Sequence, residues 1–242
     1  MLVTLDQVRA ELAPKGVLRA GINLSNFLLV TGRTAAGEPE GVSPSLAAEI
    51  ARRLDVAIEY VVFKNPGELA DAATEDLWDI GLIGAEPARA EHIRFTVAYA
   101  EIEATFMVPS GSTIKRIDEV DSPGVRISVP ERAAFELWLT ENIRHAELHR
   151  AAGRQAYDDF VAYNMDALAG LRAGLINDLE NLPGSRLLDG KFTSVQQAIG
   201  TPKDRQAAAN YLDAFVSDVK STGFVGSLIE RFGVSGRLTV AP

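Results

Sequence analysis

Hydrophobic positions in the first third of the chain follow two different spacings in alternation. Residues 17–22 and 57–63 are short runs rich in aliphatic and β-branched side chains, which predicts two strands. Between them, apolar residues at helical spacing predict a helix with one apolar face over residues 45–54. Pro66 opens a further helix, because proline is favoured in the first turn, and residues 78–83 predict a buried strand. Strands that alternate with helices imply right-handed crossovers and a mainly parallel sheet.

A second alternating unit follows a predicted strand at residues 102–109 and a turn-rich segment that ends at residue 124. Its predicted elements alternate between extended and helical segments: 125–129, 133–142, 146–150, a helix that holds Phe160, 166–169, a further helix, and a strand at 193–199. The chain ends in two amphipathic helices on either side of Gly223, and it begins with a short helix that Thr4 caps. The pattern therefore predicts an α/β fold with two alternating units.

Composition excludes several classes of function. Lys and Arg total 24 against 33 Asp and Glu, so the net charge is −9 and nucleic acid is not expected as a main partner. The same charge does not exclude an anionic ligand, because one well-placed arginine outweighs screened surface charge. The chain has no cysteine, which rules out disulfides, thiolate metal sites and cysteine nucleophiles. His145 and His149 could share a helical face, but no second ligand pair accompanies them, so we expect no metal and no cofactor.

Residues 1–12 lack the basic leader and the uninterrupted apolar stretch of a secretory signal peptide. No apolar run reaches the ~18 residues of a membrane helix. We therefore expect a cytoplasmic location for the chain as it stands, and a periplasmic one if a signal peptide has been removed.

Five segments occur in an order typical of one protein family. They are residues 16–22, the turn and helix at 37–54, the buried strand at 78–84, the arginine motif from Pro87 to Tyr99, and the return strand at 196–203. In this order the chain resembles the type II periplasmic solute-binding proteins, in particular the amino-acid ABC transporter branch of the bacterial extracellular solute-binding proteins, family 3.

The resemblance implies a two-lobed, periplasmic-binding-protein-like (type II) fold with two crossover hinge strands. Lobe 1 would comprise residues 1–107 and 193–242, and lobe 2 residues 108–192. Such a protein closes by hinge motion on a small carboxylate-bearing solute in the cleft between its lobes and delivers it to the membrane component of an ABC transporter. We expect a monomer.

The resemblance places the main ligand contacts of lobe 1 around Arg89, which would form a bidentate ion pair with the ligand's carboxylate. Without the motif, Arg89 would be interpreted as a solvated surface arginine. Gly84 would let the backbone approach the ligand, and Asn23, Asn26 and Phe27 follow the first strand, where such loops present binding groups. Glu86, three residues before Arg89, is interpreted as a helix-capping acid rather than as a ligand contact.

Lobe 2 departs from the family at two positions. Arg132 and Ala133 stand where relatives carry Gly-Ser or Gly-Thr at a helix N-terminus, so the hydroxyl is lost while the N–H groups remain. Gly170 stands where amino-acid binders place an Asp for the ligand's ammonium, and Arg172 follows it. These changes favour a carboxylate without an ammonium, or a more acidic ligand. The alternative for Arg172 is a solvated helix residue.

Enzymatic function is the weaker alternative. No nucleophile elbow, phosphate loop or dinucleotide fingerprint occurs, and the adjacent carboxylates Asp158 and Asp159 would diverge on a helix. The same fold also hosts a cyclohexadienyl dehydratase that acts on prephenate-like acids, and Glu103 and Glu131 are the acids that such chemistry could use here. A stand-alone cytoplasmic ligand sensor is a third possibility, although no DNA-binding segment is attached.

Overall fold

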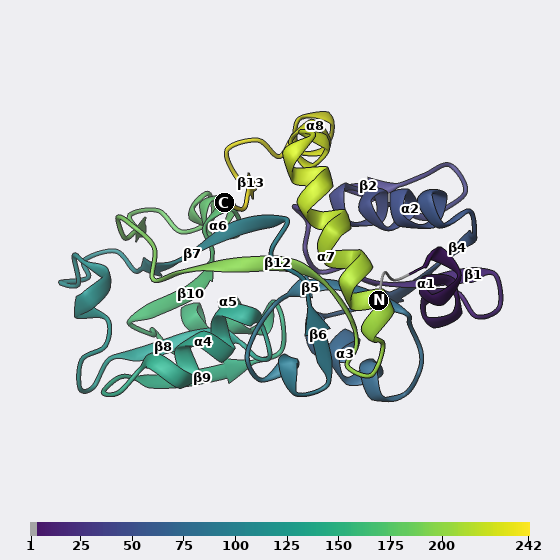
Figure 1. Ribbon diagram of the computed structural model, residues 1–242. Coiled ribbons are helices and arrows are strands. Elements are labelled where there is room, and N and C mark those ends of the chain that lie inside the picture. The colour runs from purple at the N-terminus through teal and green to yellow at the C-terminus, as the bar shows by residue number, and fades with distance from the viewer. Residues whose placement is uncertain (1–3) are drawn as a thin grey trace. The chain divides into compact units, whose positions relative to one another are not determined.

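A computed structural model describes residues 4–242, which divide into two compact units. The first unit comprises the chain up to Glu101 together with Gln196–Pro242, and the second is Ile102–Val195. The chain passes between them twice, within strands β7 (Ala100–Val108) and β12 (Thr193–Pro202) (Figure 1).

The first unit is built on four long strands in the order β4 (Ala57–Phe63), β1 (Val17–Asn23), β5 (Ile80–Gly84) and β12. Strand β1 is parallel to both β4 and β5, whereas β12 runs antiparallel to β5. The helix that precedes β4, α2 (Val42–Leu54), packs on β1 and β4, and α3 (Pro66–Asp71) packs on β5 and β1. The parallel β-α-β arrangement predicted from the hydrophobic pattern is confirmed.

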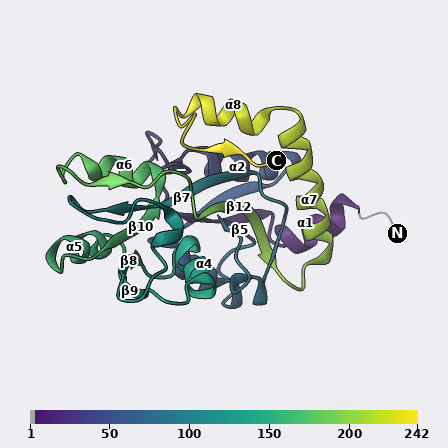
Figure 2. The ribbon, with the colours of Figure 1, turned by 90° about the vertical axis from the view of Figure 1, so that its left-hand side faces the viewer.

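Shorter elements and three helices complete the first unit. These are α1 (Leu5–Leu12), β2 (Gly32–Arg33), β3 (Pro39–Glu40), η1 (Ala72–Thr74), η2 (Arg89–Glu91), β6 (Ile93–Phe95), α7 (Gln206–Ser221), α8 (Phe224–Arg231) and β13 (Thr239–Val240). Thr4 caps α1 through a reciprocal pair of hydrogen bonds with Gln7, as a capping box does. Helix α7 packs against α1 and α8, and Figure 2 shows α7 and α8 as consecutive helices near the C-terminus.

Trp78 holds β5 closely against β1. Its side chain is fully buried, and its indole N–H donates to the carbonyl of Leu69 at 2.9 Å. A Cβ atom on Gly21 would lie 3.2 Å from the indole ring, and one on Gly81 would lie 2.9 Å from the Leu69 side chain. The ring packs this closely because both strands carry glycine at the point of contact.

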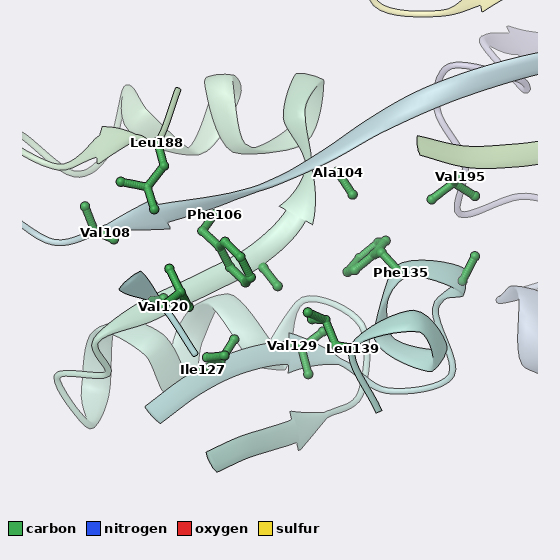
Figure 3. Packing of buried hydrophobic residues seen from close by; sticks show 13 residues of the cluster. Ala104, Phe106, Val108, Val120, Ile127, Val129, Phe135, Leu139, Leu188 and Val195 are labelled. Atoms are coloured by element: carbon green, nitrogen blue, oxygen red, sulfur yellow. The ribbon is translucent and has the colours of Figure 1, made fainter. Parts of the chain in front are cut away.

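The second unit repeats the alternating pattern around strands β7, β10 (Ala167–Leu171), β8 (Arg126–Pro130) and β9 (Glu147–Ala151), in this spatial order. Its other elements are η3 (Ile117–Glu119), α4 (Ala134–Asn142), α5 (Gln155–Ala162), α6 (Arg172–Leu179) and β11 (Arg186–Leu187). Strand β8 is parallel to β9 and β10. One of the hydrophobic clusters of this unit contains Phe106, which lies between Leu188 and the strand residues Ile127 and Val129 (Figure 3).

The predicted arrangement of the two neighbouring histidines is wrong. His145 and His149 do not share a helical face, because His149 lies in strand β9 and His145 lies in the loop before it. His149 instead contacts Asp159 of α5, with 2.7 Å between Nε2 and Oδ2.

A buried carboxylate fixes the first end of β5. Asp79 is fully buried, and its Oδ1 accepts hydrogen bonds from the guanidinium groups of Arg19 (2.8 Å) and Arg205 (2.7 Å). Its Oδ2 accepts from the backbone N–H and the Nε of Arg19, at 2.9 and 3.0 Å. A buried charge is stable only when it is paired and hydrogen-bonded, so this cluster connects β5 to β1 and to the segment before α7.

We predict that Asp79→Asn lowers the free energy of unfolding by about 3 kcal/mol, because it removes the buried one of the two carboxylates that pair with Arg19 and Arg205. The matched control is Asp76→Asn, which removes a carboxylate from the same cluster. The Asp76 side chain is 75% exposed, so this change is expected to lower stability by less than about 1 kcal/mol. Urea titration of both variants measures the difference, and equal losses would contradict the structural role given to Asp79.

Candidate functional site

The sequence-predicted residues of the first unit gather at one edge of its sheet. Asn23 ends β1 and Gly84 ends β5. The two strands are parallel, with Ile22 opposite Leu82, so their carboxyl ends lie at the same edge. In α/β proteins this edge commonly presents the groups that bind ligands.

Arg89 is buried at this edge. It begins the short helix η2, and only 6% of the residue is exposed. Its Nη1 donates to the carbonyl of Gly84 at 2.7 Å, and its backbone N–H donates to the carbonyl of Glu86 at 3.0 Å. The interpretation of Arg89 as a solvated surface arginine is therefore wrong. The turn holds a guanidinium, the group best suited to bind a carboxylate with two parallel N–H···O bonds.

The last part of the arginine motif, Phe95-Thr96-x-x-Tyr99, has a structural role. The Thr96 hydroxyl accepts the backbone N–H of Ile199 at 3.2 Å, and the Tyr99 N–H donates to the carbonyl of Gln197 at 2.9 Å, which attaches this segment to β12. The Tyr99 hydroxyl lies 3.0 Å from the Ser43 hydroxyl at the start of α2. Complete burial raises the pKa of Tyr99, so the phenol stays protonated.

The two asparagines after β1 shape their own loop. Asn23 Oδ1 accepts from the backbone N–H and the hydroxyl of Ser25, at 3.1 and 2.8 Å. Asn26 is buried, and its Oδ1 accepts from the N–H of Leu28 at 3.2 Å. A hydrogen bond between an asparagine side chain and the backbone two residues later is typical of turns. Phe27, between Asn26 and Leu28 in the chain, is 39% exposed.

Glu86 does not cap the helix as the sequence suggested. The residue in the N-cap position of η2 is Ala88, and what closes the turn is the backbone carbonyl of Glu86, which accepts the N–H groups of Arg89 and Ala90 at 3.0 Å each. Burial raises the pKa of the Glu86 carboxyl to about 7, although the nearby Arg89 acts in the opposite direction. The sequence did not predict this half-buried environment of the Glu86 carboxyl. The sign available in the sequence was an acid three residues before Arg89.

In the second unit, the N-terminus of α4 carries a carboxylate of its own. Glu136 is buried in the first turn, where its Oε2 accepts the backbone N–H of Arg132 at 2.9 Å. Its Oε1 accepts from Arg150 Nε and from the Thr140 hydroxyl, both at 2.8 Å. The helix dipole at Ala133, the N-cap residue, is thus already partly balanced by an acid of the chain.

Arg132 occupies a backbone conformation that favours glycine. Its φ is +60°, in the left-handed region, and the residue is exposed. The glycine that the family resemblance implies near this position would adopt this conformation without strain.

Gly170 lies on β10, opposite Thr105 of β7. A Cβ atom at this position would come within 2.9 Å of the buried Leu175 side chain. The position where relatives place an acid is therefore crowded by an apolar side chain.

Arg172 is engaged within the second unit. Its Nε lies 2.8 Å from Glu103 Oε2, and its Nη2 donates to the carbonyl of Gly190. Lys191 Nζ lies 3.8 Å from the other oxygen of Glu103. Arg172 begins α6, and 29% of its side chain is exposed, so it is a partly solvated helix residue whose charge Glu103 compensates within the second unit.

Across residues 4–242, no helix is both long and apolar enough to span a membrane. The family model described as "Bacterial extracellular solute-binding proteins, family 3" matches residues 23–235. No curated protein sequence is significantly similar to the chain.

Solved structures of similar fold include the solute receptor for L-cysteine of Neisseria gonorrhoeae, which is 17% identical, with 98% of this chain and 100% of that chain covered and a TM-score of 0.76. An amino acid ABC transporter substrate-binding protein from Streptococcus pneumoniae, bound to L-arginine, is 17% identical over 93% of this chain and 98% of that chain, with a TM-score of 0.73. An ancestral amino acid-binding protein, a precursor of cyclohexadienyl dehydratase, is 19% identical over 96% and 99%, with a TM-score of 0.73.

These likenesses show that the fold is that of the type II periplasmic binding proteins. The family model covers far more than half of the 242 residues. The chain therefore belongs to the bacterial extracellular solute-binding proteins, family 3.

Proposed function

We propose that the protein reversibly binds a small solute that carries a carboxylate, and that Arg89 holds this carboxylate. The observation that carries the proposal is the buried position of Arg89 at the carboxyl edge of β1 and β5, where the Gly84 carbonyl orients its guanidinium. A guanidinium and a carboxylate match in plane and in spacing, so that two parallel hydrogen bonds form at once. Burial strengthens such a pair when both groups are fully hydrogen-bonded.

The ligand is best sought among amino acids and related organic acids. The similar proteins of known structure include a receptor for L-cysteine and a protein bound to L-arginine, and both ligands carry an α-carboxylate. In this proposal, Phe27 and the amides of Asn23 and Asn26 contact the remainder of the ligand. Closure of the two units on the ligand, which the family resemblance implies, stays a prediction.

The proposed role is that of the substrate-binding component of an ABC transporter. This role requires the protein to meet its solute outside the cytoplasm, whereas the sequence-based expectation of a cytoplasmic location fits a stand-alone ligand sensor. Cell fractionation with an antibody against the chain separates these two roles, because the transporter role requires the protein in the extracytoplasmic fraction.

We propose binding rather than catalysis. Of the two acids that a dehydratase reaction could use, Glu103 pairs with Arg172 and Lys191, and Glu131 is exposed to solvent. Both side chains are open to solvent, with 49% of the Glu103 side chain exposed, so neither lies in the kind of buried site in which catalytic acids are commonly found.

Arg89→Ala is predicted to weaken binding by about 2–5 kcal/mol, because it leaves the ligand's carboxylate without its partner. Arg89→Lys is expected to lose a large part of the same free energy, since a single ammonium does not replace the bidentate pair. Isothermal titration calorimetry with the best ligand from a thermal-shift screen of amino acids and organic acids measures both changes.

Two controls make the result interpretable. Arg94→Ala removes the same charge five residues along the chain, where the guanidinium donates to Gln206, and is expected to leave affinity unchanged. Circular dichroism must show that Arg89→Ala is folded, because loss of the bond to Gly84 is expected to reduce stability by about 1 kcal/mol. A folded Arg89→Ala variant with wild-type affinity would disprove the proposal.

A further inference from the structure

The turn that positions Arg89 contains a second charged group. Glu86 lies between Gly84 and Arg89, and its backbone carbonyl accepts the N–H groups of Arg89 and Ala90. Its side chain is half-buried. Throughout residues 4–242, the carboxylate of Glu86 makes no hydrogen bond or salt bridge to the protein.

A half-buried carboxylate without such a partner is unfavourable in its charged form. Burial raises the pKa of Glu86 to about 7, and this effect exceeds the opposing attraction of Arg89. A cation brought to this carboxylate by a ligand would compensate for the lost hydration, as ion pairing does for other buried acids.

Charged groups on the neighbouring elements are already engaged or remote. Strand β12 lies beside β5, and there it contributes the neutral amides of Gln196 and Gln197. Glu101 of β7 accepts from Gln196 Nε2 at 3.0 Å. Glu91, the last residue of η2, is exposed. Arg89 is therefore the charged group that acts on Glu86.

The second unit has no acid at the position where the family resemblance places one. Gly170 takes that position, and the Leu175 side chain crowds the space that a side chain at residue 170 would need. This glycine is the basis for expecting a ligand without an ammonium, or a more acidic ligand. The glycine is equally compatible with an acid that lies in the first unit.

We propose that Glu86 determines the ligand specificity of the Arg89 site by accepting hydrogen bonds from the ligand's ammonium while Arg89 binds its carboxylate. This inference rests on the proposed function. An ionised Glu86 cancels much of the attraction that Arg89 exerts on a simple carboxylate. A zwitterionic amino acid supplies a charge of the right sign for each residue, so the site favours it over the acid that lacks the ammonium.

The test compares three amino acids with the matching acids that lack the α-ammonium. The pairs are L-arginine with 5-guanidinopentanoate, L-lysine with 6-aminohexanoate, and L-cysteine with 3-mercaptopropionate. Calorimetric titrations at about pH 8 use the wild type, Glu86→Gln, and Glu91→Gln as a matched control five residues along the chain, at the end of η2. At this pH Glu86 is mostly ionised.

We expect the wild type to bind at least one of the amino acids about tenfold or more tightly than its partner acid, a difference of about 1.4 kcal/mol. Glu86→Gln is expected to remove this preference by weakening the amino acid, whereas Glu91→Gln keeps it. Equal preference in the wild type and in Glu86→Gln overturns the inference. So does a wild type that binds only the acids without ammonium, although the proposed role of Arg89 then survives. Failure of all six compounds to bind the wild type overturns this inference and the proposal of an amino-acid ligand together.

The pH dependence of stability tests the environment of Glu86 without any ligand. The pKa of the Glu86 carboxyl is raised from 4.5 to about 7 in the folded state. The protonated carboxyl therefore makes its full contribution to stability below about pH 4.5, and this contribution is lost as the pH rises through about 7. Glu86→Gln is therefore expected to lose less stability than the wild type between these pH values, and Glu91→Gln to follow the wild type. Urea titrations across this range that gave parallel curves for wild type and Glu86→Gln would overturn the placement of Glu86 in a partly buried site.

Discussion

A guanidinium buried at the end of a sheet is the constraint on which this account depends. Removing a charge from water is unfavourable unless polar groups replace the lost hydration, and Arg89 is 6% exposed. The Gly84 carbonyl is one group that replaces it, at 2.7 Å. This bond exists because β5 ends at Gly84 and the chain turns directly into η2. Strand β5 therefore sets the position of the arginine.

The other end of β5 is fixed by a second buried charge. Asp79 binds the guanidinium groups of Arg19 and Arg205, which come from β1 and from the segment before α7. Trp78 packs against glycines on both strands, which allows the indole ring to lie close to them. A short strand held by an ion-pair cluster at its start thus positions Arg89, the arginine proposed to bind the ligand, just beyond its end, and a site gains precision when a rigid part of the fold holds it.

Much of the fold follows from the sequence, because each long element carries its own signal. Helix α2 has an apolar stripe, β4 has a run of β-branched and aromatic residues, and Thr4 with Gln7 forms a capping box within one turn. The choice of Arg89 as the main candidate for ligand binding could also be made from the sequence, because Arg89 lies at the arginine position of a family motif.

The remaining features depend on residues that are distant in the chain or on burial. The pairing of Arg172 with Glu103 joins residues 69 positions apart, and no local pattern indicates it. Leu175 explains the glycine at 170 only once β10 and α6 are packed together. The raised pKa of Glu86 arises from desolvation, which depends on the atoms around a group and not on its neighbours in sequence.

A crystal structure of the protein with the amino acid for which it has the highest affinity tests the role of Arg89 most directly. We predict two parallel N–H···O bonds of about 2.7–2.9 Å from Arg89 to the ligand's carboxylate. A complex in which other groups hold the carboxylate, with no Arg89 N–H within hydrogen-bonding distance of the ligand, would contradict it.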